Sequence, residues 1–314
     1  MENRKLIKLG NSSFAVALPK EWVDKSGLKK GDDVFIERNG NGELTIASNR
    51  VNSKDNKSVD VNLQNKDEDF IKRKLHALYI QGYSTINIKG DARVKKKIKE
   101  LIKDYLSLEI VDSNESGIIV KDYFDIRESR FEHFVRKIDT CLREMFDIVL
   151  DSIKKDKIDS GSIKELVEID KSVNKFYFLC SRIFVEGIDN PSILNLFRMD
   201  GSKLFGNWWT SFNLESLGDQ LKYILNDTQK INSKQKEAVH LILSKLKEAY
   251  ISSIESFYKE NSEESLAVIQ ETMKIKLDIE KLEEDCNILR ISYALDKIQK
   301  NVYQNAKMIS YMKF

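Results

Sequence analysis

The sequence predicts a multidomain α+β protein in which a short hairpin domain, a small α/β domain and an all-helical domain follow one another. Three observations predict it: β-type runs surround Gly10, strand and helix patterns alternate in the next part of the chain, and only helical periodicity continues after Tyr123. The predicted bounds are 1–48 for the hairpin domain, 49–58 for a linker, 59–122 for the α/β domain, and 123–314 for the helices, with repeats at about 123–230 and 231–314.

We expect a cytoplasmic protein that is not an enzyme. Hydrophobic residues make up 41% and charged residues 32% of the chain, and a formal net charge of +2 can hide a basic patch. No apolar run is long enough to cross a bilayer, and no signal-peptide core begins the chain, so we expect no membrane insertion. We expect Cys141, Cys180 and Cys286 to be reduced core residues, since the three histidines form no catalytic pattern with them.

The first 47 residues predict a segment that folds only with a partner. Two short strands flank a Gly10-Asn-Ser turn, where glycine and asparagine tolerate positive φ. Pro19 then opens a short helix by presetting its first φ, and a hairpin that ends at 43–47 closes the segment. A segment this short rarely buries a core alone, and it has no cysteine for a disulfide. We therefore expect a homodimer formed through residues 1–48.

The next segment predicts the small α/β domain. A polar linker enters a strand at 59–63, and apolar residues at helical spacing follow until Gly82 ends the helix. The Lys95-Lys96-Lys97 run is typical of a solvated helix face rather than of a nucleic-acid site. The predicted elements are the strand 59–63, the helix 67–80, the strand 84–88, the helix 91–105, and the strands 108–111 and 117–120.

The rest of the chain predicts six long amphipathic helices. Only two prolines, Pro19 and Pro191, occur in the chain, and Gly, Asn and Ser residues supply the breaks between helices. Six helices divide naturally into two sets of three. Trp208, Trp209 and Phe212 form the densest aromatic cluster and are expected to pack against other residues. The predicted helices span 124–156, 160–188, 210–230, 233–259, 262–284 and 286–312.

The run from Lys8 to Ser12, with Val16-Ala-Leu-Pro19 and Gly31-Asp32, resembles the swapped-hairpin DNA-binding domains of the AbrB, SpoVT and MazE type. The resemblance implies that two chains interleave their hairpins into one small β-barrel that binds promoter DNA. Where several relatives have an arginine in the second strand, this chain has Ala17, which weakens specific base readout. The residues that the resemblance implies for DNA contact are Arg4, Lys5, Lys8, Asn11, Ser12, Ser13 and Lys20.

The helical part resembles PhoU proteins, regulators of phosphate uptake, and the whole order of domains resembles archaeal PhoU-type regulators with an AbrB-like first domain. The motif-bearing stretches are 170–182, 213–221 and 289–294. The resemblance implies tandem three-helix bundles and a divalent or iron-type metal ion in the first repeat. The implied ligands are Asp170, Glu215 and Asp219, and the departures from the family's acidic pattern are Asn174, Leu289, Tyr293 and Lys300.

Together these resemblances imply a dimeric transcriptional regulator of phosphate homeostasis that binds promoter DNA through its hairpin. The alternative is an adaptor whose hairpin only dimerises and whose helices dock on a phosphate transporter or sensor kinase. Ala17 and the small net charge favour this alternative. A third class, an antitoxin, shares the hairpin but usually has a short disordered tail, unlike these long predicted helices.

Overall fold

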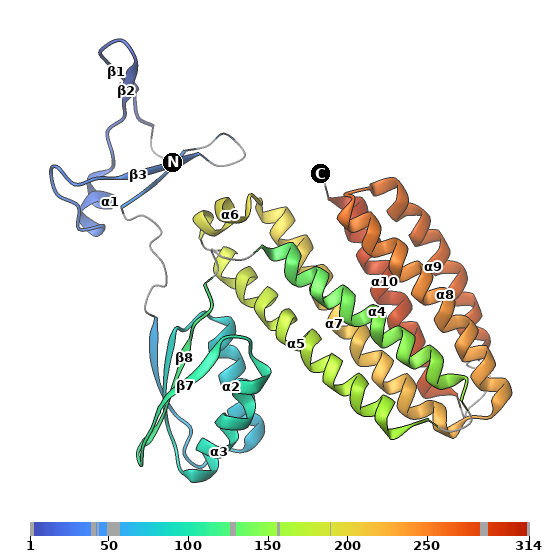
Figure 1. The fold of residues 1–314 in the computed structure, drawn as a ribbon. Helices are drawn as coiled ribbons and strands as arrows, with labels where there is room; N and C mark the ends of the chain where they lie inside the picture. The colour runs from blue at the N-terminus through green and yellow to red at the C-terminus, as the bar shows by residue number, and fades with distance from the viewer. Residues whose placement is uncertain are drawn as a thin grey trace. The chain divides into compact units, whose positions relative to one another are not determined.

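The computed structural model describes residues 3–38, 42, 44–48, 57–125, 130–155, 158–188, 190–282 and 288–312. The chain divides into two compact units, Met1–Ser53 and Lys54–Phe314 (Figure 1). The α/β and helical parts, which the sequence predicts as separate domains, thus belong to one compact unit. The predicted linker falls almost wholly on residues outside the described ranges, as does Cys286.

The first unit contains two separate hairpins and one short helix, as the sequence predicts. Gly10 adopts the positive φ, +66°, that the first turn requires. Pro19 corrects one detail: it is the N-cap of the helix, with an extended ψ of 128°, rather than its first residue. Each hairpin forms its own two-stranded antiparallel sheet, so the predicted barrel is not closed within the described part of one chain. The elements are β1 Ile7–Leu9, β2 Ser13–Ala15, α1 Lys20–Lys25, β3 Phe35–Arg38 and β4 Leu44–Ala47.

The second unit begins with the predicted α/β fold. Its sheet has the strand order β5-β6-β8-β7, in which β5 and β6 are parallel and the other neighbours antiparallel. Asp67 and Asp91 cap the two helices by accepting the backbone N–H groups of Phe70 and Val94 at 2.7 and 2.9 Å. The elements are β5 Ser58–Asn62, α2 Glu68–Ile80, β6 Thr85–Lys89, α3 Ala92–Leu101, the 3-10 turn η1 Ile102–Asp104, β7 Leu108–Ser113 and β8 Gly117–Asp122.

The helical part contains the six long predicted helices and one short helix that the sequence reasoning missed. Pro191 begins the short helix α6. Asp200 caps α7 by accepting from the Lys203 backbone N–H at 2.8 Å, so α7 begins at Gly201, nine residues before the predicted start at Thr210. The start of α7 was missed because its aromatic residues lie on several sides of the helix and so do not show the apolar spacing of one buried helical face. The helices are α4 Phe131–Ile153, α5 Ser160–Ile188, α6 Pro191–Phe197, α7 Gly201–Asp227, α8 Ser233–Tyr258, α9 Ser262–Leu282 and α10 Leu289–Tyr311.

The long helices pack as two sets of three. Helices α4, α5 and α7 contact one another, and so do α8, α9 and α10, while α7 with α10 and α4 with α8 join the sets (Figure 1). Fully buried aliphatic and aromatic side chains such as Phe146 and Tyr250, whose rings stack at 5.5 Å between α4 and α8, fill the space between them. None of the described helices is long and apolar enough to cross a membrane.

Candidate nucleic-acid interface and acid cluster

All seven residues predicted to contact DNA lie on or beside the first hairpin or at the start of α1, and all are exposed. Lys8 lies opposite Phe14 and Leu9 opposite Ser13, so the turn at 10–12 places Asn11 and Ser12 at the end of the hairpin. The exposed predicted residues are Arg4, Lys5, Lys8, Asn11, Ser12, Ser13 and Lys20. The structure thus gives a nucleic-acid backbone access to each of them.

The charge on this hairpin is of one sign. Four basic side chains and no Asp or Glu lie between Asn3 and Lys20. No ion pair joins Lys5, Lys8 or Lys20 to another residue that the structure describes. Exposed ammonium groups without an acidic partner create the local positive potential that attracts phosphates, although the whole chain is nearly neutral.

The same unit also exposes apolar side chains that a folded domain would normally bury. Leu6 and Phe14 of the first hairpin are 72% and 66% exposed, and Ile36 and Leu44 of the second are 61% and 67% exposed. None of the unit's residues whose burial the structure describes is buried. A unit without a core of its own gains little hydrophobic stabilisation, so this geometry fits the predicted need for a second chain.

The three predicted metal ligands lie close together, but a lysine that the sequence reasoning missed lies among them. Asp170 is on α5, whereas Glu215 and Asp219 are on α7; we call these three residues the acid cluster. The Lys222 Nζ atom lies 2.5 Å from Asp170 Oδ2 and 2.7 Å from Asp219 Oδ1. Asn174 Nδ2 donates to the same Asp170 oxygen at 3.2 Å. The sequence signal for Lys222 was its position three residues after Asp219, on the same helical face.

Burial shifts the protonation equilibria of the acid cluster. It raises the pKa of Glu215 to about 7, with the Asp219 and Asp170 carboxylates adding to the shift and Lys222 opposing it. Burial also raises the pKa of Asp170, again against the effect of Lys222. For Lys222, burial disfavours the ammonium, but the hydrogen bonds to Asp170 and Asp219 and the attraction of their charges together outweigh burial and raise its pKa. The cluster therefore keeps Lys222 charged, and Glu215 loses its proton at a higher pH than an exposed glutamate does.

This arrangement does not fit the predicted metal ion, because the Lys222 ammonium already contacts two of the three carboxylates. Among the described residues, no group of three or more His, Cys, Asp or Glu side chains is placed to hold a metal. In the second repeat, Leu289 and Tyr293 are exposed, and Lys300 forms an ion pair with Asp296 at 2.5 Å. The metal site remains a prediction that this geometry does not support.

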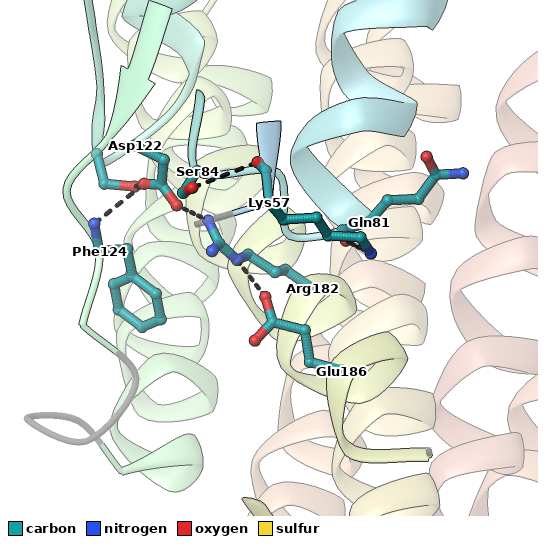
Figure 2. A network of polar contacts seen from close by, with 8 residues as sticks. Lys57, Gln81, Ser84, Asp122, Phe124, Arg182 and Glu186 are labelled. Carbon is teal, nitrogen blue, oxygen red and sulfur yellow. Dashed lines mark hydrogen bonds and ion pairs between the residues drawn. The ribbon is translucent and has the colours of Figure 1, made fainter. Parts of the chain in front are cut away.

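A second polar network, which the sequence could not reveal, joins the α/β part to the helices. Arg182 of α5 donates from Nη1 to Asp122 Oδ2 at the end of β8, and from Nε to Glu186 Oε1 at 2.7 Å (Figure 2). Asp122 also accepts hydrogen bonds from the Ser107 hydroxyl and from the Phe124 backbone N–H, the latter at 3.0 Å. Sixty positions separate Arg182 from Asp122 in the sequence, so no local pattern predicts the pair.

Burial makes this network a fixed junction rather than a surface contact. The Arg182 and Asp122 side chains are 7% and 0% exposed. The Arg182 guanidinium also lies 5.4 Å from the ring centre of Tyr79 on α2, and His76 packs edge-on against Phe178 of α5 at 4.2 Å. The end of the sheet and helix α2 are therefore attached to α5 by charge and by aromatic packing.

The structure also places the lysine run, the aromatic cluster and two of the three cysteines. Lys97 of the lysine run pairs with Glu68 at 2.5 Å, which is the behaviour of a solvated helix face. Trp208 stacks on Phe184 with ring centres 4.4 Å apart and donates from Nε1 to the Ser181 hydroxyl at 3.3 Å, so the aromatic cluster packs as expected. Cys141 and Cys180 are both free thiols, and Cys180 is buried.

Comparison with known proteins gives one match. Residues 7–54 match the model of a family described as "Antidote-toxin recognition MazE, bacterial antitoxin". The first unit is MazE-like. No curated protein and no solved structure matches the chain.

The MazE-like stretch takes in both hairpins and α1, together with five of the seven predicted DNA contacts; Arg4 and Lys5 immediately precede it. The likeness stated for the first unit is therefore confirmed at the level of this family. The likeness of the helices to PhoU proteins and the archaeal origin receive no support from these comparisons, and both remain predictions.

Proposed function

We propose that the protein is a dimeric DNA-binding regulator whose two amino-terminal units fold together and hold DNA against their first hairpins. The observation that carries the proposal is a MazE-like hairpin with four basic and no acidic residues between Asn3 and Lys20. No residue of this unit whose burial the structure describes is buried, which supports the dimer.

The proposed contacts are chiefly to phosphates. Arg4, Lys5 and Lys8 supply charge, while Asn11 and Ser12 at the turn supply neutral hydrogen-bonding groups. Each phosphate that the protein neutralises lowers the logarithm of affinity by about 0.9 per tenfold increase in salt. Ala17 offers no hydrogen bond to a base edge, so we expect modest discrimination between DNA sequences.

The helical part is proposed to be the sensing or interaction module, without catalytic activity. Its assignment to phosphate homeostasis rests on the resemblance to PhoU proteins alone. Within this unit the buried Arg182–Asp122 pair connects the bundle to the α/β part, and it therefore offers a route by which a change in α5 reaches the sheet.

An adaptor remains the second candidate, and one observation favours it. The first hairpin exposes more large apolar side chains than basic ones, among them Leu6, Ile7, Leu9, Phe14 and Val16. Apolar surface of this kind suits protein contact, so the hairpin could serve dimerisation alone while the helices dock on a phosphate transporter or sensor kinase.

Fluorescence anisotropy with labelled duplex DNA separates the two candidates. The full chain is titrated against a phosphate-transport promoter and an unrelated duplex of equal length, over a series of salt concentrations. Replacing Arg4, Lys5 and Lys8 by glutamine is expected to weaken binding and to reduce the salt slope by up to about 0.9 for each phosphate that the variant no longer neutralises.

The matched control replaces Lys25, Lys29 and Lys30 by glutamine, because it removes the same charge from the same unit away from the first hairpin. Equal losses in the two triple variants would show that only net charge matters and would refute the hairpin as the binding surface. Absence of binding even at low salt, with a stable dimer in sedimentation, would establish the adaptor instead.

A further inference from the structure

The cation bound in the acid cluster is the ammonium group of Lys222. The Lys222 ammonium contacts carboxylate oxygens from two helices, at 2.5 Å on Asp170 of α5 and at 2.7 Å on Asp219 of α7. The distance to Asp219 is typical of a charge-assisted hydrogen bond, and the contact with Asp170 is shorter still. The lysine side chain is 22% exposed and that of Asp170 only 8%, so solvent screens this contact less than it screens a surface pair.

The acid cluster has a carboxylate oxygen that Lys222 does not contact. Asp170 Oδ1, the second oxygen of the carboxylate that binds Lys222, is buried and has no hydrogen-bond partner. Glu215 adds a third carboxyl group, and electrostatic interactions link it to Asp170 and Asp219. Three carboxyl groups with a free buried oxygen resemble the oxygen donor set that hard divalent cations require.

We propose that Lys222 is a built-in replacement for a metal ion, so that the helical unit works without metal, and that removing this ammonium converts the acid cluster into a divalent-cation site. The lysine joins α5 to α7 as a bound cation would, but it is always present. The proposal does not depend on DNA binding or on dimerisation.

Two independent measurements test the proposal on the full chain. The first is elemental analysis of the wild-type protein after incubation with manganese or iron salts and dialysis. We expect less than one metal ion per ten chains, because Lys222 already contacts two of the three acids. Stoichiometric metal in the wild-type protein would overturn the proposal.

The second measurement is the thermal unfolding of Lys222→Ala with EDTA or with millimolar manganese chloride. We expect the variant to melt below wild type in EDTA and to recover several degrees in manganese, because a ligand that binds only the folded state stabilises it. Wild type and Lys222→Arg, which keep a cation in place, are expected to melt at the same temperature in both buffers.

A second variant ties any recovery to the acid cluster. In Lys222→Ala combined with Glu215→Gln, loss of one carboxylate ligand is expected to remove most of the recovery in manganese. Lys230→Ala is the matched control, since it frees only Asp227, a single partner at 2.5 Å, and should show no response. Equal melting of Lys222→Ala in EDTA and in manganese would overturn the proposal.

Discussion

Replacing Asp122 by alanine is expected to destabilise the Lys54–Phe314 unit strongly, because it leaves the Arg182 guanidinium buried without its main partner. The two side chains are 7% and 0% exposed, so water cannot replace the missing carboxylate. Glu186 remains as a partner, but its own side chain is 25% exposed. Removing one member of a buried ion pair costs about 3–5 kcal/mol. For a unit of this size, that corresponds to a fall in melting temperature of roughly 6–20 °C.

Thermal and urea unfolding of the full chain, followed by far-UV circular dichroism at pH 7.5, measure this loss. The control is Asp227→Ala, which breaks the pair with Lys230, whose side chain is 65% exposed, and should change stability by less than about 1 kcal/mol. Asp122→Leu combined with Arg182→Met should lose less than Asp122→Ala alone, because no charge is left buried. A loss for Asp122→Ala no larger than that of the control would refute the reasoning.

Three further predictions concern other parts of the molecule. Phe14→Ser is expected to shift the sedimentation equilibrium towards monomer, since it removes a ring that is 66% exposed and needs a partner; an unchanged dimer would exclude the hairpin as the contact. The pKa of Glu215 is raised from 4.5 to about 7 in the folded state, so the folded state holds this proton more tightly than the unfolded state does. The free energy of unfolding is therefore expected to fall as the pH rises from about 4.5 to about 7. Urea unfolding at pH 5 and 7 should show this loss, roughly 2–3 kcal/mol, in wild type but not in Glu215→Gln. Gly117→Ala should destabilise much more than Gly206→Ala in the same assay, because the new Cβ meets the backbone oxygen of Ile88 at 2.2 Å in the first case and only the flexible Met312 sulfur at 2.4 Å in the second. Similar losses in the two glycine variants would contradict this explanation.

Most of the fold could be predicted because its signals are local. The turn glycine Gly10, the capping residues Asp67 and Asp91, and the apolar period of the long helices each act within a few residues of the chain. The start of α7 was missed because its aromatic residues do not follow one helical face. The union of the α/β part with the helices was missed for a different reason: it depends on Arg182 and Asp122, which meet only in the folded unit.

The two candidate sites also differ in how much of each could be predicted from the sequence. The basic hairpin could be found from sequence because Arg4, Lys5 and Lys8 lie within five residues of one another and no acidic residue interrupts them. The set of three acids came from the resemblance to PhoU proteins, and residue spacing placed only Glu215 and Asp219 on one helical face; the role of Lys222 depends on which way its side chain points. Lys222 lies three residues after Asp219, which from sequence alone predicts an ordinary ion pair on the helix surface. The structure adds the contact with Asp170 on another helix, which places the Lys222 ammonium within the acid cluster.

The two units differ in whether they bury a hydrophobic core within one chain. This difference makes the folding of the first unit, and with it DNA binding, depend on dimerisation. The second unit has an extensive buried core, whereas no residue of the first unit whose burial the structure describes is buried. If the first unit folds only when two copies meet, its folding free energy depends on protein concentration. Anything that holds two helical units together raises the effective concentration of their hairpins and so strengthens DNA binding without touching DNA. A regulator built this way can respond to a signal through association alone.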